Sequence, residues 1–257
     1  MAGEKIHEVA ASGFARGAEE YEAGRPGYPQ AAVDLIAREL EIGPGSTVVD
    51  VGAGTGKFTR LLLPTGARVV GVEPVAEMRE VFARAVPGVE IVDGTAEAIP
   101  LGDGEVDVVT AAQAFHWVDA VPAVAEVHRV VRPGGGVAFL WNSRDASVDW
   151  VRRVKELMDR VVGGTPRYGN AYGGGWERAM ADHGGFTPME RVELAHEHPV
   201  DRELMRARVA STSYVSMLPD SERAAVLAEI DAIVDEAGLG ETFTEPYRTE
   251  VFWCTRR

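Results

Sequence analysis

The stretch TVVDVGAGTGKF, residues 47–58, decides the fold. Its first five residues are β-branched apart from Asp50, which predicts a buried strand. Three alternating glycines, Gly52, Gly54 and Gly56, allow a tight turn and let the backbone approach a ligand closely. Residues 55–63 have helical character, and the start of a helix offers free N–H groups. Strand, glycine loop and helix together predict a nucleotide-type binding site.

The spacing of the glycines narrows the choice of ligand. A dinucleotide fold requires G-x-G-x-x-G, but Lys57 occupies the position of the third glycine. A P-loop requires a glycine at the position of Val51 and Ser or Thr at the position of Phe58. Asp50 would repel a pyrophosphate and suits a cationic amine. We therefore expect an amino-acid nucleoside rather than a dinucleotide, and the alternative is a glycine turn without a ligand.

This motif resembles the first motif of the class I S-adenosylmethionine-dependent methyltransferases, of the methyltransferase type 11 kind. The resemblance implies S-adenosylmethionine as cofactor and S-adenosylhomocysteine as product. It also implies cofactor contacts from the motif itself, at Asp50, Gly52, Ala53, Gly54 and Gly56.

A second cofactor contact is expected at Glu73, nineteen positions beyond Gly54 and at the end of a predicted strand. At this spacing an acidic residue meets a ribose diol, and its carboxylate can accept hydrogen bonds from both hydroxyl groups. Pro74 follows and starts the next helix. A solvated acid at a strand end is the alternative interpretation of Glu73.

The resemblance further implies that Thr95 and Ala96 meet the adenine edge of the cofactor. Many relatives carry an aspartate at the position of Thr95, so this chain departs from the family pattern there. Gln113 and Phe115 follow the predicted strand 106–112, at the strand end where open α/β sheets place their ligands.

Two short sequence segments indicate a branch of the family. Residues 114–119 (AFHWVD) and 25–29 (RPGYP) look like the branch that includes the trans-aconitate methyltransferases. This resemblance implies a small-molecule acceptor methylated at oxygen, with a carboxylate as the candidate group. In related enzymes an N-terminal arm reaches the methionine carboxylate of the cofactor, and Arg25 suits that contact because a guanidinium binds a carboxylate in bidentate fashion.

His116 is the candidate general base, because histidine titrates near neutrality. It could equally orient a loop or pack on Trp117. A carboxylate acceptor would need cations, and Arg144, Arg152 and Arg167 are candidates, although each could be an ordinary surface charge. The candidate substrate contacts are Tyr21, Tyr28, Trp117, Trp141 and Arg144.

The alternation of apolar runs and helical patterns predicts an α/β fold with a doubly wound, mostly parallel sheet. We expect strands at 47–51, 67–73, 89–93, 106–112, 137–141, 188–196 and 247–254. Together with the resemblance this implies a seven-stranded Rossmann-like methyltransferase fold whose last strand lies antiparallel beside strand five. We expect one domain, 1–257, with a capping arm (1–28), a cofactor-binding core (29–141), a lid (142–185) and a C-terminal part with helices (186–257).

Composition excludes several function classes. The formal net charge of −14 argues against a nucleic-acid partner but permits a local basic pocket. With one cysteine, Cys254, and no long apolar run, we expect a cytoplasmic protein without a membrane partner. No Cys/His cluster has the spacing of a metal site.

Three functions stay open from the sequence. The leading hypothesis is an enzyme that transfers a methyl group from S-adenosylmethionine to a small organic acceptor. The alternatives are a non-catalytic module that binds the adenosyl nucleoside, and an NAD(P)-dependent reductase, which Lys57 disfavours.

Overall fold

The computed structural model describes residues 25–162 and 175–257, so the predictions for Tyr21 and Arg167 lie outside the described residues. Seven strands form one sheet in the order β3-β2-β1-β4-β5-β7-β6. The strands are β1 (Thr47–Val51), β2 (Arg68–Val72), β3 (Glu90–Val92), β4 (Val106–Ala112), β5 (Val131–Arg144), β6 (Glu190–Asp201) and β7 (Thr242–Thr255).

The first five strands are parallel, and β7 inserts antiparallel between β5 and β6. This arrangement confirms the predicted α/β sheet and its antiparallel late strand. The carboxyl ends of the parallel strands meet at one edge of the sheet. At that edge, Arg144 at the end of β5 lies opposite Tyr247 of β7.

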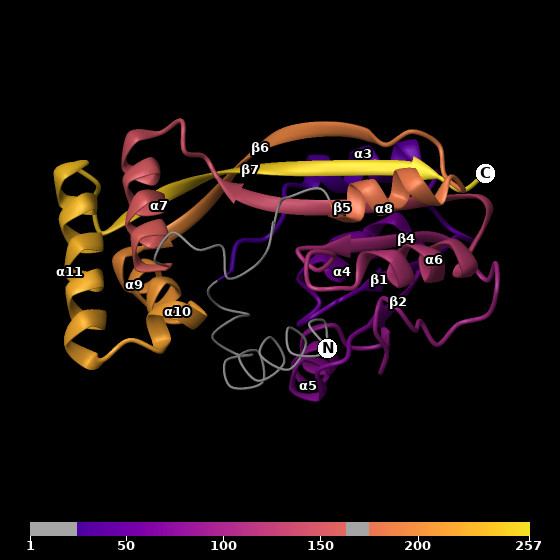
Figure 1. The fold of residues 1–257 in the computed structure, drawn as a ribbon, viewed down its shortest axis with the longest axis horizontal. Helices are drawn as coiled ribbons and strands as arrows, with labels where there is room; N and C mark the ends of the chain where they lie inside the picture. The colour runs from indigo at the N-terminus through magenta and orange to yellow at the C-terminus, as the bar shows by residue number, and fades with distance from the viewer. Residues whose placement is uncertain (1–24, 163–174) are drawn as a thin grey trace.

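Helices cover both faces of the sheet (Figure 1). Apolar residues of α3 and α4 pack against one face, and those of α6 and α8 pack against the other. The helices of this part are α3 (Gln30–Glu39), α4 (Lys57–Leu62), α5 (Ala76–Ala85), α6 (Ala120–Val130) and α8 (Gly175–His183), and the short helix η1 (Leu63–Thr65) follows α4.

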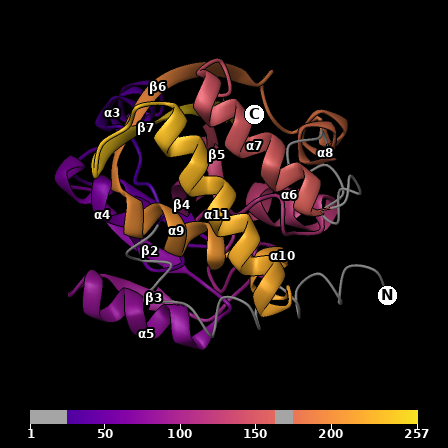
Figure 2. The same cartoon turned by 90° about the vertical axis from the view of Figure 1, so that its left-hand side faces the viewer.

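A separate group of helices lies beyond the carboxyl ends of the strands, and we call it the helical cap. It consists of α7 (Asp149–Val162), α9 (Arg202–Ala210), α10 (Ser213–Ser216) and α11 (Asp220–Glu236). The cap has its own apolar cluster, in which Met205, Val209 and Ile230 are almost completely buried. The cap faces the viewer in Figure 2, and the long strands β5, β6 and β7 connect it to the rest of the sheet (Figure 1).

The long strands differ from their predicted bounds. β5 begins at Val131, before the predicted start at residue 137, and the Gly134 N–H donates to the Arg256 carbonyl at 2.9 Å. β6 and β7 extend because each residue from Glu190 to Asp201 finds a partner in the other strand. That pairing continues past the core and carries the strands to the helical cap.

The described residues of the predicted lid (142–185) are 142–162 and 175–185, and they lie in two different environments. Residues 142–144 complete β5, and α8 belongs to the layer that covers the sheet. Trp176 of α8 stacks on Trp141 at 4.8 Å between ring centroids, which fixes α8 to the core. Of the two helices in the described part of this segment, α7 packs in the helical cap and α8 packs on the sheet. The lid itself stays a prediction.

Candidate functional site

A cavity of about 460 Å³ lies at the carboxyl ends of β1, β4 and β5. Open α/β sheets bind their ligands at this edge. The lining residues come from the chain before α3, the glycine loop, the ends of β1, β4 and β5, β7 and the helical cap. They are Arg25, Pro26, Tyr28, Asp50, Gly52, Ala53, Gly54, Thr55, Lys57, Phe58, Ala112, Gln113, His116, Trp117, Asn142, Ser143, Arg144, Lys155, Arg208, Thr212 and Tyr247.

The glycine loop needs glycine at two positions for different reasons. Gly52 has φ +67°, and a Cβ there would lie 2.4 Å from the Cβ of Ala114. Gly56 has φ +85° and would meet the side chain of Val86 at 2.4 Å, so it allows the loop to pack on α5. Left-handed backbone of this kind favours glycine. The loop is therefore held close to its neighbours while its Gly52–Thr55 stretch lines the cavity.

Asp50 is a buried carboxylate on the cavity wall, with 1% of its surface exposed. Its Oδ2 accepts from the Thr59 hydroxyl at 2.6 Å, and its Oδ1 accepts from the Thr110 hydroxyl at 3.0 Å. Burial raises the pKa of Asp50 from 3.8 to about 6, although both hydroxyl groups act in the opposite direction. A cation in the cavity would stabilise the ionised form.

Glu73 holds the glycine loop in place. Its Oε2 accepts the Gly54 N–H at 2.9 Å, and its Oε1 accepts the Val75 N–H at 2.9 Å. The side chain is 7% exposed, and burial raises its pKa. Each carboxylate oxygen can accept a further hydrogen bond, so this arrangement is compatible with the predicted ribose contact.

Gln113 adopts a left-handed backbone, with φ 55°, directly after β4. This conformation is costly for a residue with a Cβ, and such strain clusters at functional sites. The Gln113 Nε2 donates to the carbonyl of Asn142 at 2.8 Å, and the Asn142 Nδ2 donates to the carbonyl of Gly27 at 2.7 Å. The two amides thus tie the ends of β4 and β5 to the chain before α3.

His116 is engaged by a tryptophan. The Trp141 Nε1–H donates to His116 Nδ1 at 3.2 Å. Burial, and to a smaller extent the charge of Arg25, lowers the pKa of His116 to about 4. The imidazole is therefore neutral at neutral pH and carries its hydrogen on Nε2. In this state His116 can donate a hydrogen bond to a ligand, but its Nδ1 lone pair is already in use.

A basic cluster forms the wall of the cavity next to the helical cap. The Arg144 Nε donates to Glu245 Oε1 at 2.6 Å, and Arg208 donates to both Glu245 Oε2 and the Tyr247 hydroxyl. Glu245 is completely buried and Arg208 is 7% exposed. The charges of Arg144 and Arg208 lower the pKa of Glu245 in spite of its burial. We call these four residues, Arg144, Arg208, Glu245 and Tyr247, the arginine wall.

The structure brings together most of the residues predicted from the sequence. The predicted residues that line the cavity are Arg25, Tyr28, Asp50, Gly52, Ala53, Gly54, Gln113, His116, Trp117 and Arg144.

Other predicted residues lie outside the cavity lining. They are Gly56, Glu73, Pro74, Thr95, Ala96, Phe115 and Trp141.

Two of these have clear roles elsewhere. Phe115 packs in the core against Phe139, with 4.3 Å between the ring centroids, and Trp141 donates a hydrogen bond to His116. Arg152, a candidate for a carboxylate acceptor, lies on the outer surface of α7 and pairs with Asp149 and Glu156. The roles of these residues toward a cofactor stay predictions.

Sequence reasoning missed Asn142, Arg208, Thr212 and Tyr247. Asn142 could have been found, because it directly follows the predicted strand 137–141. Arg208 and Thr212 lie on or just after a helix of the cap, more than 60 positions from β5, and their sequence surroundings carry no motif. Only the folded chain places them beside Arg144.

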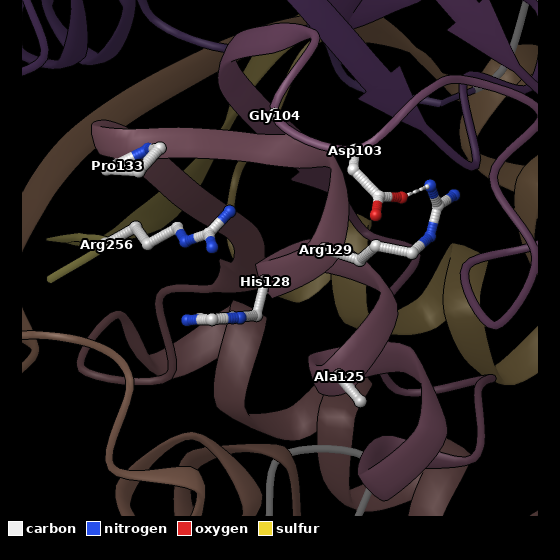
Figure 3. Close-up of a pocket in the computed structure, with 7 residues that line it drawn as sticks. All are labelled: Asp103, Gly104, Ala125, His128, Arg129, Pro133 and Arg256. Atoms are coloured by element: carbon white, nitrogen blue, oxygen red, sulfur yellow. Dashed lines mark hydrogen bonds and ion pairs between the residues drawn. The ribbon is translucent and has the colours of Figure 1, made fainter.

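A second hollow, of about 440 Å³, lies at the opposite edge of the sheet (Figure 3). It lies among the turn before β4, the end of α6, the start of β5 and the end of β7, where His128, Arg129 and Arg256 are its basic residues. Arg129 pairs there with Asp103 at 2.6 Å and with Glu126 at 2.7 Å. Because it contains none of the glycine loop, this hollow is not the predicted site.

The chain is similar to proteins that are named as methyltransferases. The family profile described as a methyltransferase domain matches residues 49–139. A Schizosaccharomyces pombe protein named as an uncharacterized methyltransferase-like protein is 34% identical over 215 residues, which cover 83% of this chain and 82% of the relative. An uncharacterized methyltransferase of Mycobacterium tuberculosis is 47% identical over 140 residues. That match covers 54% of this chain and 56% of the relative, so the chain spans little more than half of the relative's length.

One further relative and one solved structure add detail. The malonyl-[acyl-carrier protein] O-methyltransferase of Serratia marcescens is 33% identical over 138 residues, which cover 51% of this chain and 52% of the relative. A solved structure from Anaeromyxobacter dehalogenans, assigned by name to the type II methyltransferases, has a TM-score of 0.63 and 26% identity. It covers 90% of this chain and 96% of the other. In the described residues, no helix combines the length and the apolar character that a membrane span requires.

Proposed function

Because the chain belongs to the class I S-adenosylmethionine-dependent methyltransferases, we propose that it transfers a methyl group from S-adenosylmethionine to a carboxylate oxygen of a small organic acid. One observation carries this proposal. A single cavity joins the glycine loop and Asp50 to His116, whose Nδ1 is occupied by the Trp141 N–H.

The residues of the glycine loop fit the cofactor. Both Gly52 and Gly54 have left-handed backbone and line the cavity, and an added Cβ at Gly54 would come no closer than 4.0 Å to another atom, that of the Gly52 carbonyl oxygen. Asp50 offers a desolvated carboxylate that a cation would stabilise. When bound, S-adenosylmethionine supplies an electrophilic methyl group on a positively charged sulfur. Asp50 would hold the cationic amine, and Arg25, which also lines the cavity, would hold the methionine carboxylate.

The state of His116 favours a carboxylate acceptor. Methylation of a hydroxyl group or of a protonated amine releases a proton, which a general base must accept. A carboxylate is already ionised at neutral pH, and its methylation to an ester releases none. With a pKa of about 4 and its Nδ1 bonded to Trp141, His116 is a weak base and a good hydrogen-bond donor through Nε2. We therefore infer that His116 orients the acceptor instead of deprotonating it.

The comparisons support transfer to oxygen. The Serratia marcescens relative is named as an O-methyltransferase that acts on a malonyl-[acyl-carrier protein]. The positive charges of the arginine wall, in a chain whose formal net charge is −14, also favour an anionic acceptor in this cavity.

The test is transfer of a radiolabelled methyl group from S-adenosylmethionine to matched series of small acids, alcohols and amines of equal chain length. We expect label in a base-labile ester with the acids, and a pH-stat should record no proton release during turnover. Preferred labelling of the amines or alcohols, with one proton released per methyl group, would refute the carboxylate assignment while leaving the methyltransferase assignment intact.

A further inference from the structure

The arginine wall contains more positive charge than its own carboxylate needs. Glu245 bonds Arg144 through one oxygen and Arg208 through the other, so two guanidinium groups share one carboxylate. Tyr247 adds no charge, because burial raises the pKa of its hydroxyl group above the ordinary value. The cluster of these four residues therefore carries one net positive charge.

Neighbouring groups do not remove this charge. Lys155, which also lines the cavity, pairs with Asp159 at 2.7 Å, so the two cancel. His198 faces Arg208 and Glu245 from β6, and burial lowers its pKa to about 4, which keeps it neutral. Asp50 is the one acidic residue among the described residues that line the cavity, and it lies in β1, directly before the glycine loop.

Arg144 is arranged to bind a ligand. It lies at the end of β5 opposite Tyr247, and its side chain is 25% exposed. Arg144 lines the cavity, and within residues 25–162 and 175–257 its guanidinium donates through Nε to Glu245, while its two terminal nitrogens have no hydrogen-bond acceptor. Arg208 is fixed by Glu245 and by the Tyr247 hydroxyl. Fixed guanidinium groups recognise planar or tetrahedral oxyanions well, because little side-chain freedom is lost on binding.

We propose that the arginine wall binds a second anionic group of the methyl acceptor, a carboxylate or a phosphate, so that the acceptor is a dianion. The inference rests on the proposed function, because it places the reacting carboxylate near His116 and the second group near Arg144. A purely structural ion pair explains the presence of two arginines beside one carboxylate less well. One arginine would neutralise Glu245, and burying a second one costs free energy that a bound anion would offset.

Binding to the full chain saturated with S-adenosylhomocysteine tests the proposal without requiring turnover. The probes are succinate, glutarate and adipate, each compared by calorimetry with the monoacid of the same carbon number. At the best chain length, the phosphonate that replaces one carboxylate distinguishes the two sources of the second anion. We expect the dianion to bind at least about tenfold more tightly than the monoacid. The tighter binder of dicarboxylate and phosphonate then identifies the second group.

Substitutions test which residues cause the preference for the dianion over the monoacid. Arg144→Met and Arg208→Met should reduce the dianion-to-monoacid affinity ratio to about one, while Arg152→Met should leave it unchanged. Arg152 is the matched control because it is an arginine on the outer surface of α7 that pairs with Asp149 and Glu156. If Arg208→Met does not fold, Arg144→Met decides, since Glu245 then keeps both Arg208 and Tyr247 as donors.

The outcomes separate this proposal from the proposed function. Equal binding of monoacid and dianion by the wild type, or a preference that survives Arg144→Met, would overturn the arginine wall as an anion site, even if methyl esters form. A dianion preference that depends on Arg144 supports the site even if no ester forms, in which case the proposed function alone fails.

Discussion

Replacing Asp50 with asparagine should make the protein more stable and at the same time weaken cofactor binding. The carboxyl group is buried, and its pKa rises from 3.8 to about 6 on folding. Because the folded value is the higher one, protonated Asp50 favours the fold. This contribution to stability is fully present below pH 3.8 and is lost as the pH rises through about 6. Asparagine removes the charge and keeps the shape.

The magnitude follows from the two pKa values. Each pKa unit is worth about 1.4 kcal/mol, so ionised Asp50 costs the folded state about 3 kcal/mol at pH 8. At pH 5 the same cost is about 1.6 kcal/mol. The stability difference between Asp50→Asn and the wild type should therefore widen by about 1.4 kcal/mol between pH 5 and pH 8. Other titrating groups are common to both proteins and cancel in this difference.

Urea unfolding at pH 5, 6.5 and 8 measures the stability difference, and calorimetry with S-adenosylmethionine measures binding to the same two proteins. We expect Asp50→Asn to be more stable at pH 8 and to bind the cofactor at least about tenfold more weakly. A stability difference that does not change with pH would refute the raised pKa. Unchanged cofactor affinity would refute the contact between Asp50 and the cationic amine.

Three further predictions test neighbouring residues. Thr110→Val removes a hydroxyl group that donates to Asp50 at 3.0 Å, so the pKa of Asp50 should rise. The pH below which cofactor affinity declines should then be about one unit higher in the variant than in the wild type, and identical pH profiles by calorimetry would contradict the contact. Glu73→Ala should weaken S-adenosylmethionine binding by about 1–3 kcal/mol, with exposed Glu77→Ala as the control. Equal affinity of the Glu73 and Glu77 variants would disprove the ribose assignment. His116→Gln, whose amide can accept from Trp141 and donate to the acceptor, should retain more turnover than His116→Ala, and kcat should show no ionisation near pH 6.5; a His116→Gln enzyme as slow as His116→Ala would contradict the donor role.

The sequence predicts the part of the site that follows strand ends directly. The glycine loop, Gln113 and His116 come within a few residues of β1 or β4, so locating the strands also locates these side chains at the edge of the sheet. Even there, adjacency is not sufficient. Phe115 neighbours His116 in the chain, but it is 1% exposed and packs in the core.

The arginine wall depends on tertiary structure. Arg144, Arg208 and Glu245 come from β5, α9 and β7, and they meet because β7 runs antiparallel beside β5 and the helical cap closes over its end. The hydrogen bond between Trp141 and His116 likewise joins residues 25 positions apart. No local pattern in the sequence encodes either arrangement.

The length of β6 also does not follow from local sequence patterns. Pro199 lies within β6, where a proline normally argues against a strand. β6 is the last strand of the sheet, and an edge strand tolerates a missing N–H on its open side. The predicted end at residue 196 was wrong, because the pairing of β6 with β7 continues through Pro199 to Asp201.

The most direct test of the central claim is a parallel calorimetric titration of the chain with S-adenosylmethionine, S-adenosylhomocysteine and NAD. The glycine loop, Asp50 and Lys57 predict that both adenosyl ligands bind and that NAD does not. Binding of NAD with no binding of either adenosyl ligand would contradict the assignment of the cavity and the methyl transfer proposed from it.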